Sequence, residues 1–157
     1  MKKYIPYAIV VLAIIVLDQV TKLWILQTMD LGDSITVIDG FFDITSHRNQ
    51  GSAWGMFQGE MTFFYITTIF AYGFFIYLAK DMDFKQKPIY TIAVILLFAG
   101  TTGNFIDRLR FQEVVDFLDF LIFGYDFPIF NVADMALVVG AIALGVDVVF
   151  GGHHENN

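Results

Sequence analysis

The chain has 157 residues, of which 57% are hydrophobic and only 16% are charged, whereas a soluble domain carries about 25% charged residues. Together with a mean hydropathy of +0.63, this composition excludes an ordinary soluble domain and indicates an integral membrane protein. The formal net charge of −7 says little about partners, but the sequence contains no basic patch for nucleic acid. The absence of cysteine excludes disulfides and thiol chemistry. The length fits a single domain over residues 1–157.

Four apolar segments have the length that a membrane-spanning helix needs. The first contains 23 residues, which is about 34 Å of helix at about 1.5 Å per residue. It resembles the start of a secretory signal, but no small-residue cleavage site follows it, so we expect a retained span. The predicted spans cover residues 4–26, 61–79, 89–107 and 129–150.

Between the first two spans the composition changes, and Asp, Gly, Ser and Thr become frequent. Short runs of β-branched and aromatic residues flank a turn at Asp39-Gly40, which predicts a small β element over about residues 33–57. The segment between the third and fourth spans is expected to be a loop. The predicted fold class is therefore an all-α integral membrane protein with four transmembrane helices and a small β-cradle.

The distribution of basic residues predicts the orientation in the membrane. Five lysines fall on the side of the two termini and three arginines on the other side, and cytoplasmic loops are the ones enriched in basic residues. We therefore expect both termini in the cytoplasm, with the β-cradle and the loop between spans three and four on the extracytoplasmic side. The residues counted are Lys2, Lys3, Lys80, Lys85 and Lys87 against Arg48, Arg108 and Arg110.

Polar residues in three of the spans are predicted to lie at one depth. Counting the helix rise from the cytoplasmic ends places Asp18 at about 21 Å, and Asn104 and Asp134 at about 24 Å. Lys22 lies one helical turn beyond Asp18 on the same face. An ionised group at such depth costs up to about 2.5–3.5 kcal/mol, so several together indicate a functional pocket. The second span contributes no such group and is expected to form a wall.

Several of these residues also have structural explanations. Asp18 and Lys22 can be a simple ion pair within one helix. Asn131 and Asp134 fit a helix start with a capping residue and an acid in the first turn. Asp107 and Arg108 can mark the interfacial end of the third span. Either Asp119 or Asp126 could replace Asp116 as the functional acid.

Two catalytic routes are compatible with the sequence, and one route without catalysis. Asp116 and Asp134 can form a carboxylate pair that shares a proton and activates water. Alternatively, a desolvated Lys22 could activate the hydroxyl of Ser52 as a nucleophile. A protein that relays protons or ions through its membrane acids is the non-enzymatic alternative, but such a relay should place acids at several depths.

Five motifs, in order along the chain, resemble those of lipoprotein signal peptidase, the type II bacterial signal peptidase family. The resemblance covers the chain from the first span to the fourth. The motifs are Asp18-Gln19-x-Thr21-Lys22, Arg48-Asn49-x-Gly51-x-Ala53-Trp54, Gly103-Asn104-x-x-Asp107-Arg108, Val114-Val115-Asp116-Phe117 and Phe130-Asn131-x-Ala133-Asp134.

The resemblance implies an aspartyl endopeptidase of the bacterial cytoplasmic (inner) membrane, with its active site toward the extracytoplasmic face and no cofactor or metal. Its expected partners are membrane lipids and a lipid-modified prolipoprotein, cleaved just before a diacylglyceryl-modified cysteine. The resemblance assigns Asp116 and Asp134 as the catalytic acids, while Ser52 and Met135 depart from the family pattern. Residues expected to bind substrate or shape the site are Asp18, Lys22, Asn49, Gly51, Asn104, Asp107, Arg108 and Asn131.

Overall fold

The computed structural model describes residues 4–51 and 56–150. In this part of the chain, four helices are long and apolar enough to cross a membrane, which confirms the predicted number of spans. A short 3₁₀ turn, η3, follows the second helix at Ala79–Asp81. The four helices are α1 Ile5–Thr28, α2 Met61–Leu78, α3 Pro88–Phe111 and α4 Val132–Phe150.

Two helix boundaries differ from the prediction by three residues or more. The third span was expected to end at residue 107, but α3 continues to Phe111 and ends where Gln112 adopts a left-handed conformation with φ of 59°. Polar residues in its last turns find partners inside the protein and therefore do not interrupt the helix. The fourth span was expected from residue 129, but α4 begins at Val132, because the side chain of Asn131 caps it.

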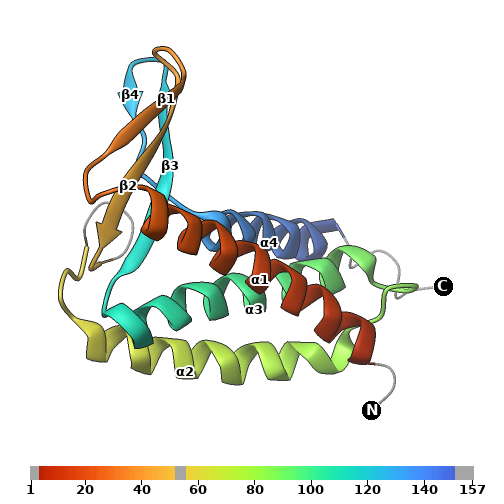
Figure 1. Cartoon of the computed structure of the whole chain (residues 1–157). Coiled ribbons are helices and arrows are strands. Elements are labelled where there is room, and N and C mark those ends of the chain that lie inside the picture. Colours follow the sequence, from red (N-terminus) through yellow and green to blue (C-terminus); the bar gives the residue numbers. More distant parts are fainter. Residues whose placement is uncertain (1–3, 52–55, 151–157) are drawn as a thin grey trace.

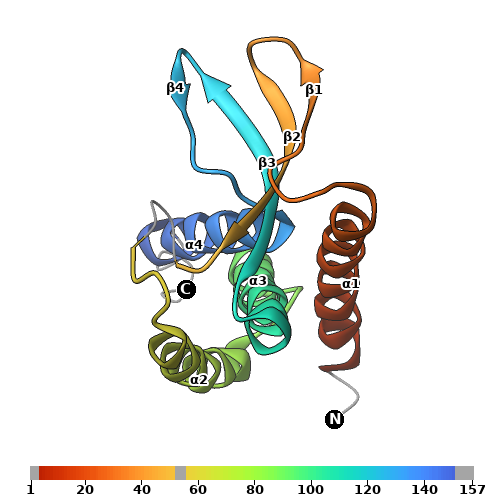
Figure 2. The same ribbon diagram turned by 60° about the vertical axis from the view of Figure 1, so that its left-hand side comes forward.

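Helix α3 lies at the centre of the bundle and contacts each of the other three helices, most extensively α4 (Figures 1 and 2). Close packing depends on small residues. A Cβ atom added at Gly103 would lie 2.5 Å from the Asp18 carboxylate on α1 and 3.0 Å from Ala133 on α4. Gly103 therefore allows three helices to meet at the level of the polar residues.

A four-stranded antiparallel sheet stands at one end of the bundle, with its strands crossing the direction of the helices (Figure 1). The strand order is β1-β2-β3-β4, so each strand pairs with its neighbour in the chain. The strands are β1 Ser34–Ile38, β2 Phe42–Asn49, β3 Val114–Ile122 and β4 Tyr125–Asp126.

The sheet is larger than predicted, because the segment expected to be a loop between spans three and four forms β3 and β4. The β element expected over residues 33–57 supplies only β1 and β2. The predicted fold class, all-α, is therefore correct only for the part of the protein that crosses the membrane. Residues 114–122 are rich in β-branched and aromatic side chains, which suit a strand. They pair with β2 through partners such as Ile44 with Leu118 and His47 with Asp116.

The sheet is amphipathic because successive side chains point to opposite faces. One face carries Ile44, Leu118 and Phe120, and the rings of Phe42 and Phe120 stack with centroids 4.4 Å apart. The other face carries acidic and hydroxyl side chains such as Asp119, which accepts a 2.7 Å hydrogen bond from the Thr45 hydroxyl. The apolar face is the one that continues toward Asp116.

A buried apolar cluster connects the sheet to the helices. Ile25 and Met29 at the end of α1 pack with Val115 and Phe117 of β3. Burying an aliphatic or aromatic side chain of this size contributes about 1.5–3 kcal/mol. The cluster therefore holds the start of β3, including Asp116, in a fixed position above the helix ends.

Candidate active site

The deepest part of the site is a buried ionic cluster that joins α1 to α3. The Lys22 ammonium lies 3.0 Å from a carboxylate oxygen of Asp18 and 3.0 Å from one of Asp107. All three side chains are almost completely buried. The expected ion pair within one helix is therefore part of a larger arrangement, in which a single cation lies between two anions from different helices.

Each carboxylate of this cluster also holds a backbone group of the neighbouring element. Asp18 accepts a 2.9 Å hydrogen bond from the Ala133 N–H at the start of α4. Asp107 accepts one of 3.1 Å from the Val115 N–H at the start of β3. The cluster thus positions the two segments that carry the predicted catalytic acids.

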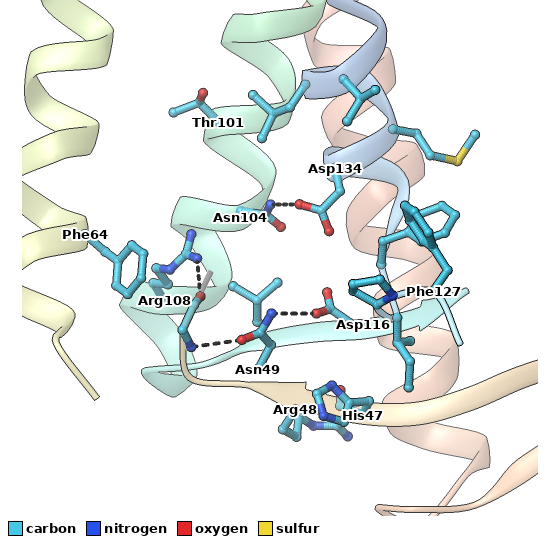
Figure 3. A pocket seen from close by; sticks show the side chains of 18 of the residues that line it. His47, Arg48, Asn49, Phe64, Thr101, Asn104, Arg108, Asp116, Phe127 and Asp134 are labelled. Carbon is cyan, nitrogen blue, oxygen red and sulfur yellow. Dashed lines mark hydrogen bonds between the residues drawn. The ribbon is translucent and has the colours of Figure 1, made fainter. Parts of the chain in front are cut away.

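Lys22 also determines how Asn104 is oriented. Its third hydrogen bond, 2.9 Å long, goes to the side-chain oxygen of Asn104. Because the oxygen of this amide faces an ammonium, its NH₂ group points the other way and donates a 2.7 Å hydrogen bond to Asp134 (Figure 3). The buried cation therefore acts on Asp134 through a correctly oriented amide.

Asn131 and Asp134 form a reciprocal capping box at the start of α4. The Asn131 side-chain oxygen accepts a 2.9 Å hydrogen bond from the Asp134 N–H, and the Asp134 carboxylate accepts one of 3.2 Å from the Asn131 N–H. This is the helix start that the sequence offered as a structural explanation. This structural role does not exclude a functional one, because Asp134 also lines the pocket.

Asp116 receives its hydrogen bonds from two asparagine side chains. Its Oδ1 accepts a 2.7 Å hydrogen bond from Asn131, and its Oδ2 accepts one of 3.0 Å from Asn49 on β2 (Figure 3). The Asn49 amide is oriented in turn by the Gly51 N–H, which donates to its oxygen at 2.9 Å. Asn131 therefore contacts both predicted catalytic acids.

The pKa of Asp116 is raised from 3.8 to about 7, first by burial and then by the negative charge of Asp134. The hydrogen bonds from Asn49 and Asn131 and the charge of Lys22 partly oppose this shift. Desolvation and a like charge both disfavour the ionised form of an acid. A carboxyl group in this position therefore exchanges its proton near neutral pH.

Asp116 and Asp134 both line a pocket of about 1250 Å³ between the sheet and the helix ends. Helix α2 supplies one side, including Phe64 and Thr68, as expected for a span that serves as a wall. Arg108 lies against this side, with its guanidinium 4.3 Å from the centre of the Phe64 ring, and donates a 3.1 Å hydrogen bond to the Gly51 carbonyl. Most other lining residues are apolar.

The structure brings the predicted site residues together, from α1, β2, α3, β3 and α4. Asp119 and Asp126, the alternative acids, do not line the pocket. Met135, one of the two departures from the family pattern, does line it. Ser52, the other departure and the candidate nucleophile, lies outside the described residues, and the three hydrogen-bonding positions of Lys22 are taken by Asp18, Asp107 and Asn104.

Gln19 was not among the site residues predicted from the sequence, although it stands next to Asp18. Its side-chain NH₂ group lies 2.9 Å from Asp107 and 3.2 Å from Asp18, and donates to the Gly103 carbonyl at 3.2 Å. Gln19 thus adds polar partners to the two carboxylates of the ionic cluster. Its position between Asp18 and Lys22 in the same motif was the feature of the sequence that could have indicated this role.

In residues 4–51 and 56–150, no cluster of three or more His, Asp or Glu residues is arranged to hold a metal ion. The fully buried ionisable side chains of the same segments belong to one connected group, in which Asn104 and Asn131 link Lys22 to Asp116. The group comprises Asp18, Lys22, Asp107 and Asp116. Acids of a relay should instead follow one another across the membrane. The distribution of buried charge does not favour the ion-pathway alternative.

The fold and the site define a polytopic membrane protein with a carboxyl pair in a pocket at one end of its helix bundle. A family model for signal peptidase II matches residues 10–150. The lipoprotein signal peptidase of Staphylococcus haemolyticus is 53% identical over 146 residues, covering 90% of this chain and 89% of that protein. The one of Staphylococcus carnosus is 48% identical over 141 residues, covering 90% and 88%.

A solved structure described as a bacterial membrane enzyme has a TM-score of 0.84 with 45% sequence identity, and covers 97% of this chain and 92% of that one. A second, similarly described, has a TM-score of 0.78 with 46% identity, and covers 92% and 93%. The chain belongs to the signal peptidase II family and is a bacterial membrane protease. The family expected from the five motifs is thereby confirmed.

Proposed function

We propose that the chain is an aspartyl endopeptidase that removes the signal peptide from diacylglyceryl-modified prolipoproteins, cutting just before the lipidated cysteine. The catalytic groups in this proposal are Asp116 and Asp134. Membership in the signal peptidase II family and the names of the staphylococcal relatives support the substrate class. The geometry of the two acids supports the mechanism.

The observation that carries the mechanism is that Asn131 contacts both acids while both line one pocket. With the pKa of Asp116 raised to about 7 by burial and by the charge of Asp134, the pair holds one proton at neutral pH. The ionised carboxylate takes a proton from a water molecule as that water attacks the scissile carbonyl. The protonated carboxyl polarises the carbonyl and later passes a proton to the leaving amine.

Arg108 is proposed to hold the substrate main chain. Its Nε atom is buried and has no hydrogen-bond acceptor among the described residues, while its Nη2 is held by the Gly51 carbonyl. Leaving a buried donor without a partner costs about 1–3 kcal/mol. A substrate carbonyl that accepts a hydrogen bond from Nε would remove this cost, which favours binding of a peptide main chain in the pocket.

The lipid on the substrate is proposed to act as an anchor. The pocket is lined largely by apolar side chains and lies beside helices that face the bilayer. Burial of acyl chains contributes about 0.8 kcal/mol per CH₂ group. A diacylglyceryl group can therefore hold the scissile bond at the carboxyl pair for longer than a peptide alone.

The proposed location is the bacterial cytoplasmic (inner) membrane, with both termini in the cytoplasm and the sheet and pocket on the extracytoplasmic side. The excess of lysine on the side of the termini supports this orientation. Because the chain has no cysteine, a cysteine introduced at one position is its only reactive thiol. A cysteine at Asp39 should react with a membrane-impermeant maleimide in intact cells, and one at Lys85 should react only after lysis.

The test of function is cleavage by purified protein in detergent. A diacylglyceryl-modified prolipoprotein should yield a signal-peptide fragment and a product that begins with the lipidated cysteine. The unlipidated precursor, at equal concentration, should be cleaved many times more slowly. Equal rates would contradict recognition through lipid, and cleavage at another bond would contradict the proposed specificity.

A further inference from the structure

The tip of the β3–β4 hairpin contains a residue that does not suit its backbone conformation. Ile122 pairs with Tyr125, so Phe123 and Gly124 form a two-residue turn, and their φ angles are 51° and 78°. A turn with two positive φ angles favours Asn, Asp or Gly at its first position. Phenylalanine is unfavourable there, because the left-handed conformation brings its Cβ close to the following carbonyl oxygen.

No packing inside the protein compensates for this conformation. The relative exposure of Phe123 is 106%. By contrast, the β1–β2 hairpin turns through three residues, Asp39, Gly40 and Phe41, and the positive φ in that turn, 67°, falls on the glycine. A bulky residue held at positive φ without internal contacts points to a contact outside the molecule.

Apolar side chains lie on both faces of the hairpin beside Phe123, and one acid, Asp126, pairs with Leu121. Leu121 and Ile122 occupy successive positions of β3, so their side chains point to opposite faces, and both are exposed. Tyr125 on β4 is exposed as well. The rest of the sheet carries polar side chains such as Asp43, Thr45 and Asp119 on one face, whereas two successive residues of β3 are apolar at this tip.

The position of the β3–β4 hairpin relative to the helices indicates where its tip lies with respect to the membrane. The four helices fix the direction that crosses the bilayer, and the sheet extends sideways from the end of the bundle, roughly across that direction (Figures 1 and 2). The tip therefore lies beside the bundle, at the level where helices leave the hydrocarbon. Trp and Tyr are enriched at this level of a membrane, and interfacial helices insert Phe and Leu side chains at the boundary between headgroups and acyl chains.

We propose that the β3–β4 tip is a membrane anchor, in which Phe123 inserts into the boundary between lipid headgroups and acyl chains. The anchor holds the free end of the sheet on the bilayer, while the buried cluster around Val115 holds its other end on the helices. This proposal does not depend on the identity of the catalytic residues, because it concerns the lipid surface alone.

The test measures depth with a nitroxide label, which the absence of cysteine makes specific. Phe123→Cys and the matched control Asp39→Cys, at the tip of the other hairpin, are labelled and reconstituted into phosphatidylglycerol-phosphatidylcholine vesicles. The label at position 123 should collide preferentially with oxygen, and the label at position 39 preferentially with a water-soluble nickel chelate. Equal preference for the nickel chelate at both positions would overturn the proposal.

A second measurement tests whether the ring contacts lipid or protein. Phe123→Asn should leave the thermal unfolding midpoint in detergent unchanged or raise it, because Asn suits the turn. In bilayer nanodiscs the same variant should give a several-fold increase in hydrogen exchange of the β3–β4 amides, and Phe123→Leu should not. A midpoint in detergent several degrees lower for Phe123→Asn, or unchanged exchange in nanodiscs, would contradict the anchor.

Discussion

Asn131 and Asp134 hydrogen-bond each other twice, and the same Asn131 side chain donates a 2.7 Å hydrogen bond to Asp116. One residue thus starts the fourth helix and connects the two acids. Asp134 is therefore both the acid in the first turn of α4 and one of the two acids of the pocket. They can nevertheless be separated by substitution.

Asn131→Ser should separate capping from catalysis. A serine hydroxyl can still accept the hydrogen bond from the Asp134 N–H, so the helix start is kept. The hydrogen bond to Asp116 is lost, and a hydrogen bond to a charged group is worth about 1.5–3 kcal/mol, or about 10- to 100-fold in rate. We expect the cleavage rate to fall by that factor, and the unfolding midpoint to fall less than in Asn131→Ala, because the cap is kept. Asn131→Ala should in addition lose about 1 kcal/mol of stability through the missing cap.

Lys22→Met should destabilise the protein strongly. It leaves Asp18 and Asp107 buried without their shared cation, and removing one partner of a buried ion pair costs about 3–5 kcal/mol. Lys80→Met is the matched control, since Lys80 is exposed and lies 5.3 Å from the Tyr77 ring centre. Thermal unfolding in detergent measures both variants. Equal midpoints for the two would show that the ionic cluster contributes little to stability.

Stability should fall as pH rises, because the pKa of Asp116 is raised by burial and by the charge of Asp134. Between its unfolded value of 3.8 and about 7, the folded state binds more protons than the unfolded state. The stability that Asp116 contributes is therefore fully present below the lower value and is lost as pH rises to the upper one. At about 1.36 kcal/mol per pKa unit, the loss is at most about 4 kcal/mol.

Asp116→Asn should flatten this dependence, because it removes the titrating group. The measurement is the unfolding midpoint of wild type and variant at several pH values across that range, with Asp126→Asn as an exposed control. An unchanged slope in Asp116→Asn would contradict the raised pKa.

Part of the site could be predicted from the sequence because helix geometry is local. Counting residues along three helices placed Asp18, Asn104 and Asp134 at one depth, and the structure joins them through Lys22 and the Ala133 N–H. The surroundings of Asp116 could not be obtained in this way. Its contact with Asn49 depends on how β2 pairs with β3, with an irregularity between Ile44 and His47 that shifts the register.

The extent of the sheet was underestimated for the same reason. Residues 114–122 form a strand because the edge of β2 is available to them, and no feature of the segment itself reveals that partner. Motif order could identify Asp116 as an acid of interest, whereas its neighbours and its position above the helix ends follow from long-range pairing.

The central claim is that Asp116 and Asp134 together activate water, and it is tested most directly by the cleavage rates of Asp116→Asn and Asp134→Asn on a lipidated prolipoprotein. Asparagine keeps the size of the side chain but cannot exchange a proton, so each variant should lose at least about 10²–10⁴-fold in rate. Asp119→Asn and Asp126→Asn, whose acids lie outside the pocket, should keep most of the activity. All four proteins are assayed in detergent after a cooperative unfolding transition has shown that they are folded. A rate near that of wild type in either Asp116→Asn or Asp134→Asn would contradict the account.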